Sequence, residues 1–152
     1  MKPENEDWPV TQKEKQPDRK WASSARMRFK PYEPNSHSVL VHQDSNIPIQ
    51  LADRFINPAI APDYLNQDFT TITPVEYLLQ VAPDYHAEHI VEALIPEAWI
   101  RELLDINEAE PCLALSRTTW VNDQVATISR LYYPGSRYSL DAKFTPADNN
   151  EI

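Results

Sequence analysis

The chain of 152 residues contains a single glycine, Gly135, beside 14 prolines. Glycine-rich phosphate loops need two or more glycines at fixed spacing, so neither G-x-x-x-x-G-K-[ST] nor G-x-G-x-x-G can occur. Both nucleotide-binding motifs are therefore excluded. Because Gly135 follows a proline in "LYYPGSRYSL", it predicts a turn that uses positive φ.

Cysteine is equally scarce, since Cys112 is the only one. One thiol cannot form a disulfide within the chain, which favours a reducing compartment and predicts a cytoplasmic protein. No run of about 18 apolar residues occurs, and no signal-peptide h-region follows Met1. The sequence therefore predicts no membrane partner.

Basic residues are few in most of the chain, whose formal net charge is −9. Residues 1–36 hold 8 Lys/Arg and 6 Asp/Glu, a net of +2, whereas residues 37–152 hold 6 and 17, a net of −11. This acidity argues against a large nucleic-acid footprint. Residues 1–36 also lack any hydrophobic period, so we expect a disordered segment outside the folded domain. We place that domain at residues 37–145, followed by a C-terminal tail at 146–152.

Alternating apolar residues begin at Ser38 and predict two strands around the turn signal Asp44-Ser45-Asn46. A three-residue loop that pairs Gln43 with Ile47 keeps the apolar residues on one face. The opposite face then carries a mixed set of side chains, namely Ser38, Leu40, His42, Gln50, Ala52 and Arg54.

The rest of the domain predicts helices and strands in turn. We expect a short helix in "NPAIAPDYLNQ", and a second one in "TPVEYLLQV", where Thr73, Pro74 and Glu76 form a capping box. "AEHIVEALI" predicts a strand and "PEAWIRELL" a helix. "PCLALSRTTWV", "QVATISRLYY" and "RYSLDAKF" predict three further strands. The fold class is therefore α+β, with helices packed on a mostly antiparallel sheet.

The second hairpin is expected to turn at Asn122-Asp123, which tolerate positive φ. A two-residue turn places Trp120 opposite Val125, and it places Thr118 opposite Thr127. The same face then holds small or hydroxyl-bearing residues between Trp120 and Tyr133, which suits the floor of a ligand pocket. An ordinary half-solvated sheet face is the alternative.

Candidate catalytic and metal-binding groups are weak. His86, His89 and Glu92 are spaced H-x2-H-x2-E, but residues three apart on a strand point to opposite faces. A lone Cys112 is most often a buried small side chain. The sequence therefore predicts no catalytic site, no metal and no cofactor.

Four stretches together resemble a known family: "PIQLADRF-NP", "APDYL-QDFT-ITP-EYL", "ELLDINEAEPCLALSRTTW" and "YPGSRY". Over about 110 residues, from His37 to roughly Thr145, the sequence is similar to the ligand-sensing (UTRA) domain of GntR-type bacterial repressors, in the branch that controls histidine utilisation. The resemblance implies a chorismate-lyase-like α+β fold, a homodimer and relief of repression by a small metabolite, which in this branch is urocanate. An enzyme of the chorismate-lyase type is the alternative, and a third is a repressor remnant that acts only by dimerising.

The resemblance also implies which residues contact the effector. Family pocket positions fall on His42, Thr73, Thr127 and Tyr133, whereas Leu40 and Ala52 depart from the family pattern. With Arg54, the expected ligand-binding set is His42, Arg54, Thr73, Tyr77, Thr127 and Tyr133.

Arg54 is the sharpest expectation from the sequence, because a guanidinium binds a planar carboxylate through two parallel hydrogen bonds. We expect Arg54 to hold the carboxylate of urocanate, and Tyr133 and Thr127 to address the imidazole. The alternative is a surface ion pair with one of the many acidic residues. Residues 1–36 show no winged-helix domain, so we expect operator DNA to be reached only through that missing domain or an intact partner.

Overall fold

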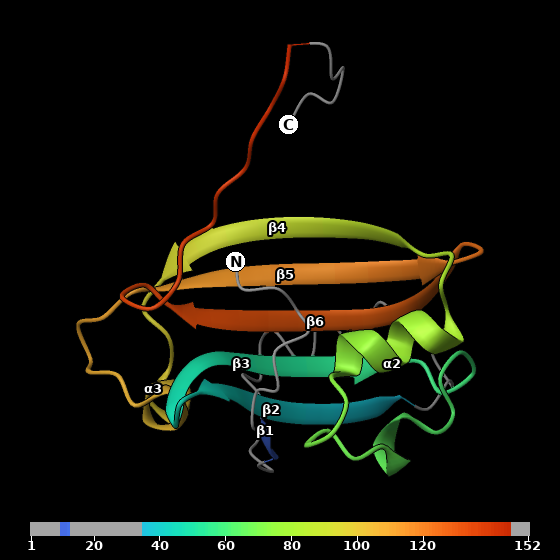
Figure 1. Cartoon of the computed structure of the whole chain (residues 1–152), viewed down its shortest axis with the longest axis horizontal. Coiled ribbons are helices and arrows are strands. Elements are labelled where there is room, and N and C mark those ends of the chain that lie inside the picture. Colours follow the sequence, from blue (N-terminus) through green and yellow to red (C-terminus); the bar gives the residue numbers. More distant parts are fainter. Residues whose placement is uncertain (1–9, 13–34, 147–152) are drawn as a thin grey trace.

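The structure, a computed structural model, describes residues 10–12 and 35–146 as one antiparallel sheet with helices on both faces (Figure 1). The sheet has six strands in the order β1-β2-β3-β6-β5-β4. The strands are β1 (Val10–Gln12), β2 (Ser36–Asp44), β3 (Ile47–Ile56), β4 (His86–Leu94), β5 (Cys112–Val121) and β6 (Gln124–Pro134). The helical elements are η1 (Tyr64–Asn66), α2 (Pro74–Val81) and α3 (Ala98–Leu104). The predicted α+β class is confirmed.

In the first hairpin the side chains lie on the predicted faces, but the turn differs from the predicted one. Its turn has two residues, Ser45 and Asn46, with φ of 51° and 65°, and Asp44 pairs with Ile47. The predicted three-residue loop is therefore wrong. A β-bulge between His42 and Gln43 shifts the register by one residue. The shorter turn shifts the pairing by one residue, and the bulge shifts it by one residue again. The two shifts cancel, so the side chains lie on the faces that the sequence predicted.

The second hairpin turns at Asn122 and Asp123 as predicted, with φ of 49° and 64°. Beyond the turn, a bulge between Thr119 and Trp120 places Thr119 opposite Thr127. The predicted pairing of Thr118 with Thr127 is therefore wrong. A one-residue shift moves every side chain of β5 that lies farther from the turn than the bulge to the other face of the sheet. The residues of β5 that share a face with Thr127 are Leu113, Leu115, Arg117 and Thr119.

Helix α2 begins as predicted. Thr73 is its N-cap, its hydroxyl accepts a hydrogen bond from Glu76 N at 3.1 Å, and Thr73 N donates to Glu76 Oε2 at 3.0 Å. Helix α3 starts at Ala98, two residues after the predicted start at Pro96, and its N-cap is Glu97. The helix expected at 57–67 is reduced to the 3₁₀ turn η1. None of the described helices is long and apolar enough to span a membrane.

Two hydrophobic clusters cover opposite faces of the sheet. Helix α3 packs on one face, where the buried residues are Val39, Val41, Leu51, Ile100, Leu103, Leu104, Cys112, Ala114 and Tyr132. The segment that contains η1 and α2 packs on the other, where they are Leu40, Ile56, Ala61, Tyr64, Phe69 and Tyr77. Helix α2 crosses in front of the β3–β6 half of the sheet in Figure 1. The face beneath α2 also carries the candidate site.

Gly135 is required for space rather than for positive φ. The structure gives it no positive φ, which corrects the prediction from the turn pattern. Its N–H donates to Pro111 O at 2.9 Å, and a Cβ built on Gly135 would lie 2.9 Å from that same oxygen. A side chain here would therefore push apart the ends of β5 and β6.

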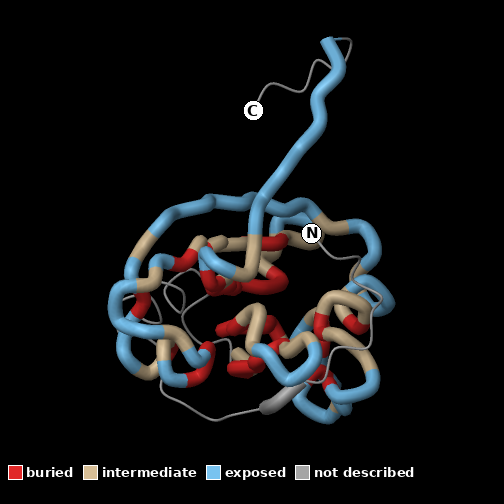
Figure 2. The backbone as a smooth tube through the Cα atoms, turned by 60° about the vertical axis from the view of Figure 1, so that its left-hand side comes forward, coloured by how far each residue is buried: buried red, intermediate tan, exposed pale blue. Residues whose placement is uncertain are grey.

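The strand predicted at 137–144 is wrong. These residues form no strand, and the segment extends away from the sheet with mostly exposed residues (Figures 1 and 2). Leu140 and Phe144 are 59% and 60% exposed. The sequence pattern is that of a strand, but no partner strand lies beside it among the described residues.

The N-terminal boundary is also different from the expected one. Val10–Gln12 pairs with β2 as the edge strand β1, although we expected residues 1–36 to lie outside the domain. The rest of that segment, residues 1–9 and 13–34, and the tail at 147–152 lie outside the described residues.

Candidate functional site

Strand register places polar and apolar side chains in three rows across the sheet, beneath α2. The first, called here the arginine row, consists of Ser38, Arg54, Ser129, Arg117 and His89. Next to it, the apolar row consists of Leu40, Ala52, Leu131, Leu115 and Val91. The polar row consists of His42, Gln50, Tyr133 and Leu113. Successive rows are two residues apart along each strand, or about 7 Å.

A cavity of about 630 Å³ lies over these rows. Its walls include Thr73 and Val75 at the start of α2, and Tyr138, Ser139 and Leu140 after β6. Volumes of this size are typical of small-molecule sites. The arginine row brings two guanidiniums to one end of the cavity, and the polar row brings hydrogen-bonding groups to the other, with apolar side chains between them. A third guanidinium in the lining, that of Arg137, donates to backbone carbonyls of Pro48, Leu104 and Asp105.

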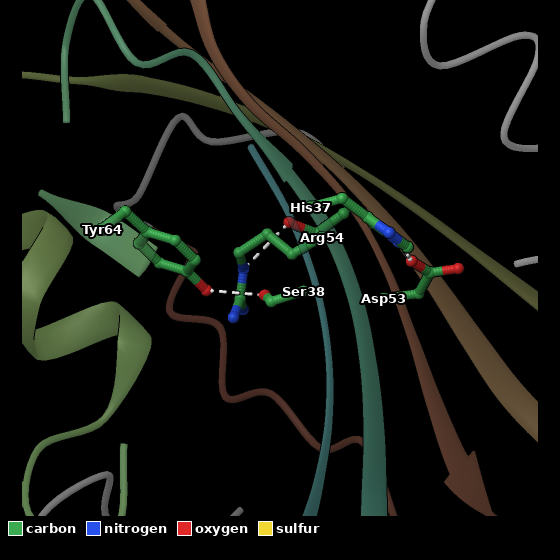
Figure 3. Close-up of polar contacts among 6 residues, drawn as sticks. His37, Ser38, Asp53, Arg54 and Tyr64 are labelled. Carbon is green, nitrogen blue, oxygen red and sulfur yellow. Dashed lines mark hydrogen bonds and ion pairs between the residues drawn. The ribbon is translucent and has the colours of Figure 1, made fainter. Parts of the chain in front are cut away.

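Arg54 is deeply buried, with 4% of its surface exposed. Its Nε donates to Ser129 Oγ at 3.1 Å, whereas its Nη1 is buried and has no hydrogen-bond partner among the described residues. Figure 3 shows its side chain on the same side of β2 and β3 as Ser38 and Tyr64, whose hydroxyls are 2.9 Å apart. The His37–Asp53 pair lies on the other side, at 2.6 Å.

Arg117 provides a second guanidinium, two strands away on β5. Its Nη2 donates to the Tyr85 hydroxyl at 3.0 Å, and its Cζ lies 5.4 Å from the centre of the Tyr85 ring. Its Nε is buried without a hydrogen-bond partner among the described residues. Both arginines are therefore held by neutral hydroxyl groups, which orient a guanidinium without neutralising it.

Two histidines and one tyrosine in the lining are uncharged near neutral pH. Burial, and then the nearby Arg54, lowers the pKa of His42 from 6.5 to about 4. Partial burial, and then Arg117, lowers the pKa of His89. Burial, and then Tyr138, raises the pKa of Tyr133 to about 12, against the hydrogen bond from Gln50. The lining residues contain one acid, Asp44, so the cavity as described is positively charged.

The UTRA domain model matches residues 11–139 of the chain. The chain belongs to the UTRA family. It is 50% identical over 109 residues to the histidine utilization repressor of Pseudomonas putida, a match that covers 72% of this chain and 44% of the relative. The corresponding repressor of Klebsiella aerogenes is 44% identical over 108 residues, which cover 71% of this chain and 45% of that protein. The chain thus spans less than half the length of the curated relatives that it matches.

A solved structure supports the same UTRA assignment. The C-terminal domain of the histidine utilization repressor from Pseudomonas syringae pathovar tomato is 41% identical, with a TM-score of 0.75 and coverage of 91% of this chain and 94% of that one. A GntR-family regulator from Enterococcus faecalis, at 17% identity, has a TM-score of 0.67 and coverage of 90% and 96%. This second likeness supports the fold alone.

Within this UTRA domain, four of the six expected site residues line the large cavity: His42, Arg54, Thr73 and Tyr133. Thr127 does not join Tyr133 there. It lines a smaller neighbouring cavity of about 40 Å³, and its Oγ1 is 2.7 Å from Thr119 Oγ1. Tyr77 packs in the core, where its ring lies 6.1 Å from that of Tyr64.

Sequence reasoning missed Arg117, although the residue lies in a strand that was predicted correctly. The predicted pairing placed Arg117 on the face away from Thr127, and the bulge next to Trp120 reverses that assignment. Gln50 was placed on the correct face without a role, and it donates to the Tyr133 hydroxyl at 2.7 Å. The residues around the turn give no local signal that reveals this bulge.

Proposed function

We propose that this UTRA domain is the effector-sensing part of a bacterial repressor of histidine catabolism, and that it binds urocanate or a related imidazole carboxylate. The observation that carries the proposal is the polarity of the cavity, which is cationic at the arginine row and hydrogen-bonding at the polar row. Urocanate has the matching polarity, with a carboxylate at one end and an imidazole at the other. The names of the similar proteins favour a regulator over an enzyme.

In this proposal the carboxylate binds at Arg54 and the imidazole lies over the apolar row toward His42 and Tyr133. A neutral His42 offers an acceptor to an imidazole N–H, and the protonated Tyr133 hydroxyl offers a donor. The Thr73 hydroxyl already accepts from Glu76 N, so its own O–H can be donated into the cavity. Thr127 lines the smaller cavity and not the large one, so the imidazole contacts of this proposal do not include Thr127.

Titration calorimetry with urocanate tests this proposal, with Arg54→Lys as the variant. Lysine keeps the charge but loses the planar fork, so affinity should fall about tenfold or more, the roughly 1.4 kcal/mol of one good charged hydrogen bond. Arg130→Lys is the matched control, because Arg130 is next to Ser129 on β6 but points to the other face. Unchanged affinity in Arg54→Lys, with the fold intact by circular dichroism, removes Arg54 from the site.

We also propose that the domain forms a homodimer. Strand β4 lies at the edge of the sheet, and its Ile90 and Val91 are 51% and 45% exposed. Pairing with a second copy would cover the β4 edge, which no described strand pairs with, and the extended segment at 138–146. Sedimentation at tens of micromolar should show a dimer, and a monomer alone would count against the proposal.

The remnant alternative predicts a different pair of results. A chain that acts only by dimerising with an intact repressor should sediment as a dimer and give no heat with urocanate. Operator DNA is then reached through the winged-helix domain of that partner, in the cytoplasm where the repressor works. Heat from urocanate would separate the effector-sensing function from this alternative.

A further inference from the structure

We propose that Arg117 completes a two-guanidinium clamp with Arg54 around the effector's carboxylate, and is therefore a specificity-determining residue of the cavity. This inference rests on the proposed function, in which the cavity holds a small carboxylate. Both arginines are opposite Ser129, one from β3 and the other from β5. Their backbones are two strand spacings apart, or about 10 Å. Two side chains of this length can reach one anion between them.

The unused donors of the two arginines support the clamp. Arg54 Nη1 and Arg117 Nε are both buried without a hydrogen-bond partner among the described residues. Leaving a buried charged donor unpaired is costly, so such groups usually have an acceptor in the functional state. Each guanidinium is already fixed through another nitrogen, to Ser129 or to Tyr85. Both guanidiniums are therefore oriented before a ligand binds, and each still has an N–H group that can donate a hydrogen bond to it.

No carboxylate of the described chain neutralises the pair. Neither Arg54 nor Arg117 has an ion pair among the described residues, where Arg130 has one with Glu92 at 3.6 Å. Asp44, the one acid in the lining, is at the end of β2 beyond His42 and away from the arginine row. Arg54 is buried and Arg117 is half-buried. Two such cations with no counter-ion among the described residues favour an anionic ligand, because pairing offsets much of the cost of burying charge.

The proposed clamp predicts that the cavity prefers a carboxylate to the corresponding amide. A carboxylate accepts from both guanidiniums, whereas the corresponding amide has one acceptor oxygen and no charge. The cavity should therefore discriminate acid from amide, and part of that discrimination should come from Arg117. A residue that merely supports the fold would affect both ligands alike.

Calorimetry on the full chain with urocanate and its primary amide tests the clamp, with Arg117→Gln as the variant. The variant should bind urocanate about tenfold or more weakly, and it should bind the amide as the wild type does. Arg130→Gln is the matched control, since Arg130 also has a buried Nε without a partner among the described residues but faces the other side of the sheet. It should change neither affinity.

Equal losses for acid and amide, or no loss for either, would overturn the clamp while leaving urocanate binding in place. If Arg117→Gln does not fold by circular dichroism, Arg117→Lys provides the same comparison with the charge retained, and a smaller acid-to-amide ratio is again expected. A further pair of probes, trans-cinnamate and its amide, separates the two proposals, because cinnamate has the carboxylate arm without the imidazole nitrogens. Arg117-dependent cinnamate binding without a preference for urocanate would support the clamp and refute the imidazole assignment. Failure of both carboxylates to bind at millimolar concentration would overturn both.

Discussion

Acid should destabilise this fold through His42. The side chain is 4% exposed, and its pKa is lowered from 6.5 to about 4 by burial and by Arg54. Between these two pH values the unfolded chain binds a proton at this position and the folded chain does not. The free energy of unfolding therefore falls as the pH falls from 6.5 toward 4, and above 6.5 the contribution is constant.

The size of this effect follows from the same interval. At about 1.4 kcal/mol per pH unit, the loss amounts to on the order of 3 kcal/mol. That is a large part of the roughly 5–15 kcal/mol that stabilises a typical domain. Urea unfolding monitored by circular dichroism between pH 7 and pH 4 measures it directly.

The decisive comparison is between the wild type and His42→Gln, since carboxylates titrate in the same range in both proteins. The curve of stability against pH should be flatter for His42→Gln by about the amount above. His86→Gln, which changes an exposed histidine of β4, should follow the wild-type curve. Parallel curves for the wild type and His42→Gln would refute the assignment of a neutral, buried imidazole.

Two further predictions concern the backbone around the cavity. Thr73→Ala removes the hydroxyl that accepts from Glu76 N, so the free energy of unfolding should fall by about 1 kcal/mol in urea melts. If Thr73 also contacts the effector, affinity should fall by more than tenfold, and equal losses would leave only the capping role. Gly135→Ala places a methyl group against Pro111 O and should cost about 1–3 kcal/mol, whereas Ser136→Ala next to it should cost less. A neutral Gly135→Ala would show that the two strand ends can separate freely.

Local chemistry was enough to predict where α2 begins and where both hairpins turn. Thr73 and Glu76 signal a helix start through their own hydrogen bonds, and Asn122-Asp123 signal a turn through their tolerance of positive φ. Such signals need no knowledge of the rest of the fold. The alternation in the first hairpin also predicted which side chains share a face, and so placed His42 and Arg54 together.

Pairing register was harder to predict because a bulge has no strong local signal. In the first hairpin the bulge at His42 compensates a turn that is one residue shorter than expected. In the second hairpin the turn has the predicted length, so no second shift cancels the bulge at Thr119. The side chains of β5 between the bulge and Cys112 therefore lie on the face opposite to the predicted one. The segment at 137–144 fails for a related reason. Alternation predicts that a strand can form, but a strand needs a neighbour, which the described residues do not provide.

The register of β5 places Arg117 on the cavity face of the sheet, and the proposed clamp would allow an acidic chain to recognise an anion. The acidic excess lies in residues 37–152, with a net charge of −11, and at physiological ionic strength charges in water are largely screened beyond about 8 Å. In the proposed clamp, Arg54 and Arg117 contact the carboxylate at hydrogen-bond distance inside the cavity that they line, where screening is much weaker. Recognition of a carboxylate then depends on two oriented guanidiniums and not on the field of the protein as a whole. In the proposed clamp, the strand register that brings both arginines opposite Ser129 would therefore determine the ligand class more directly than the overall composition does.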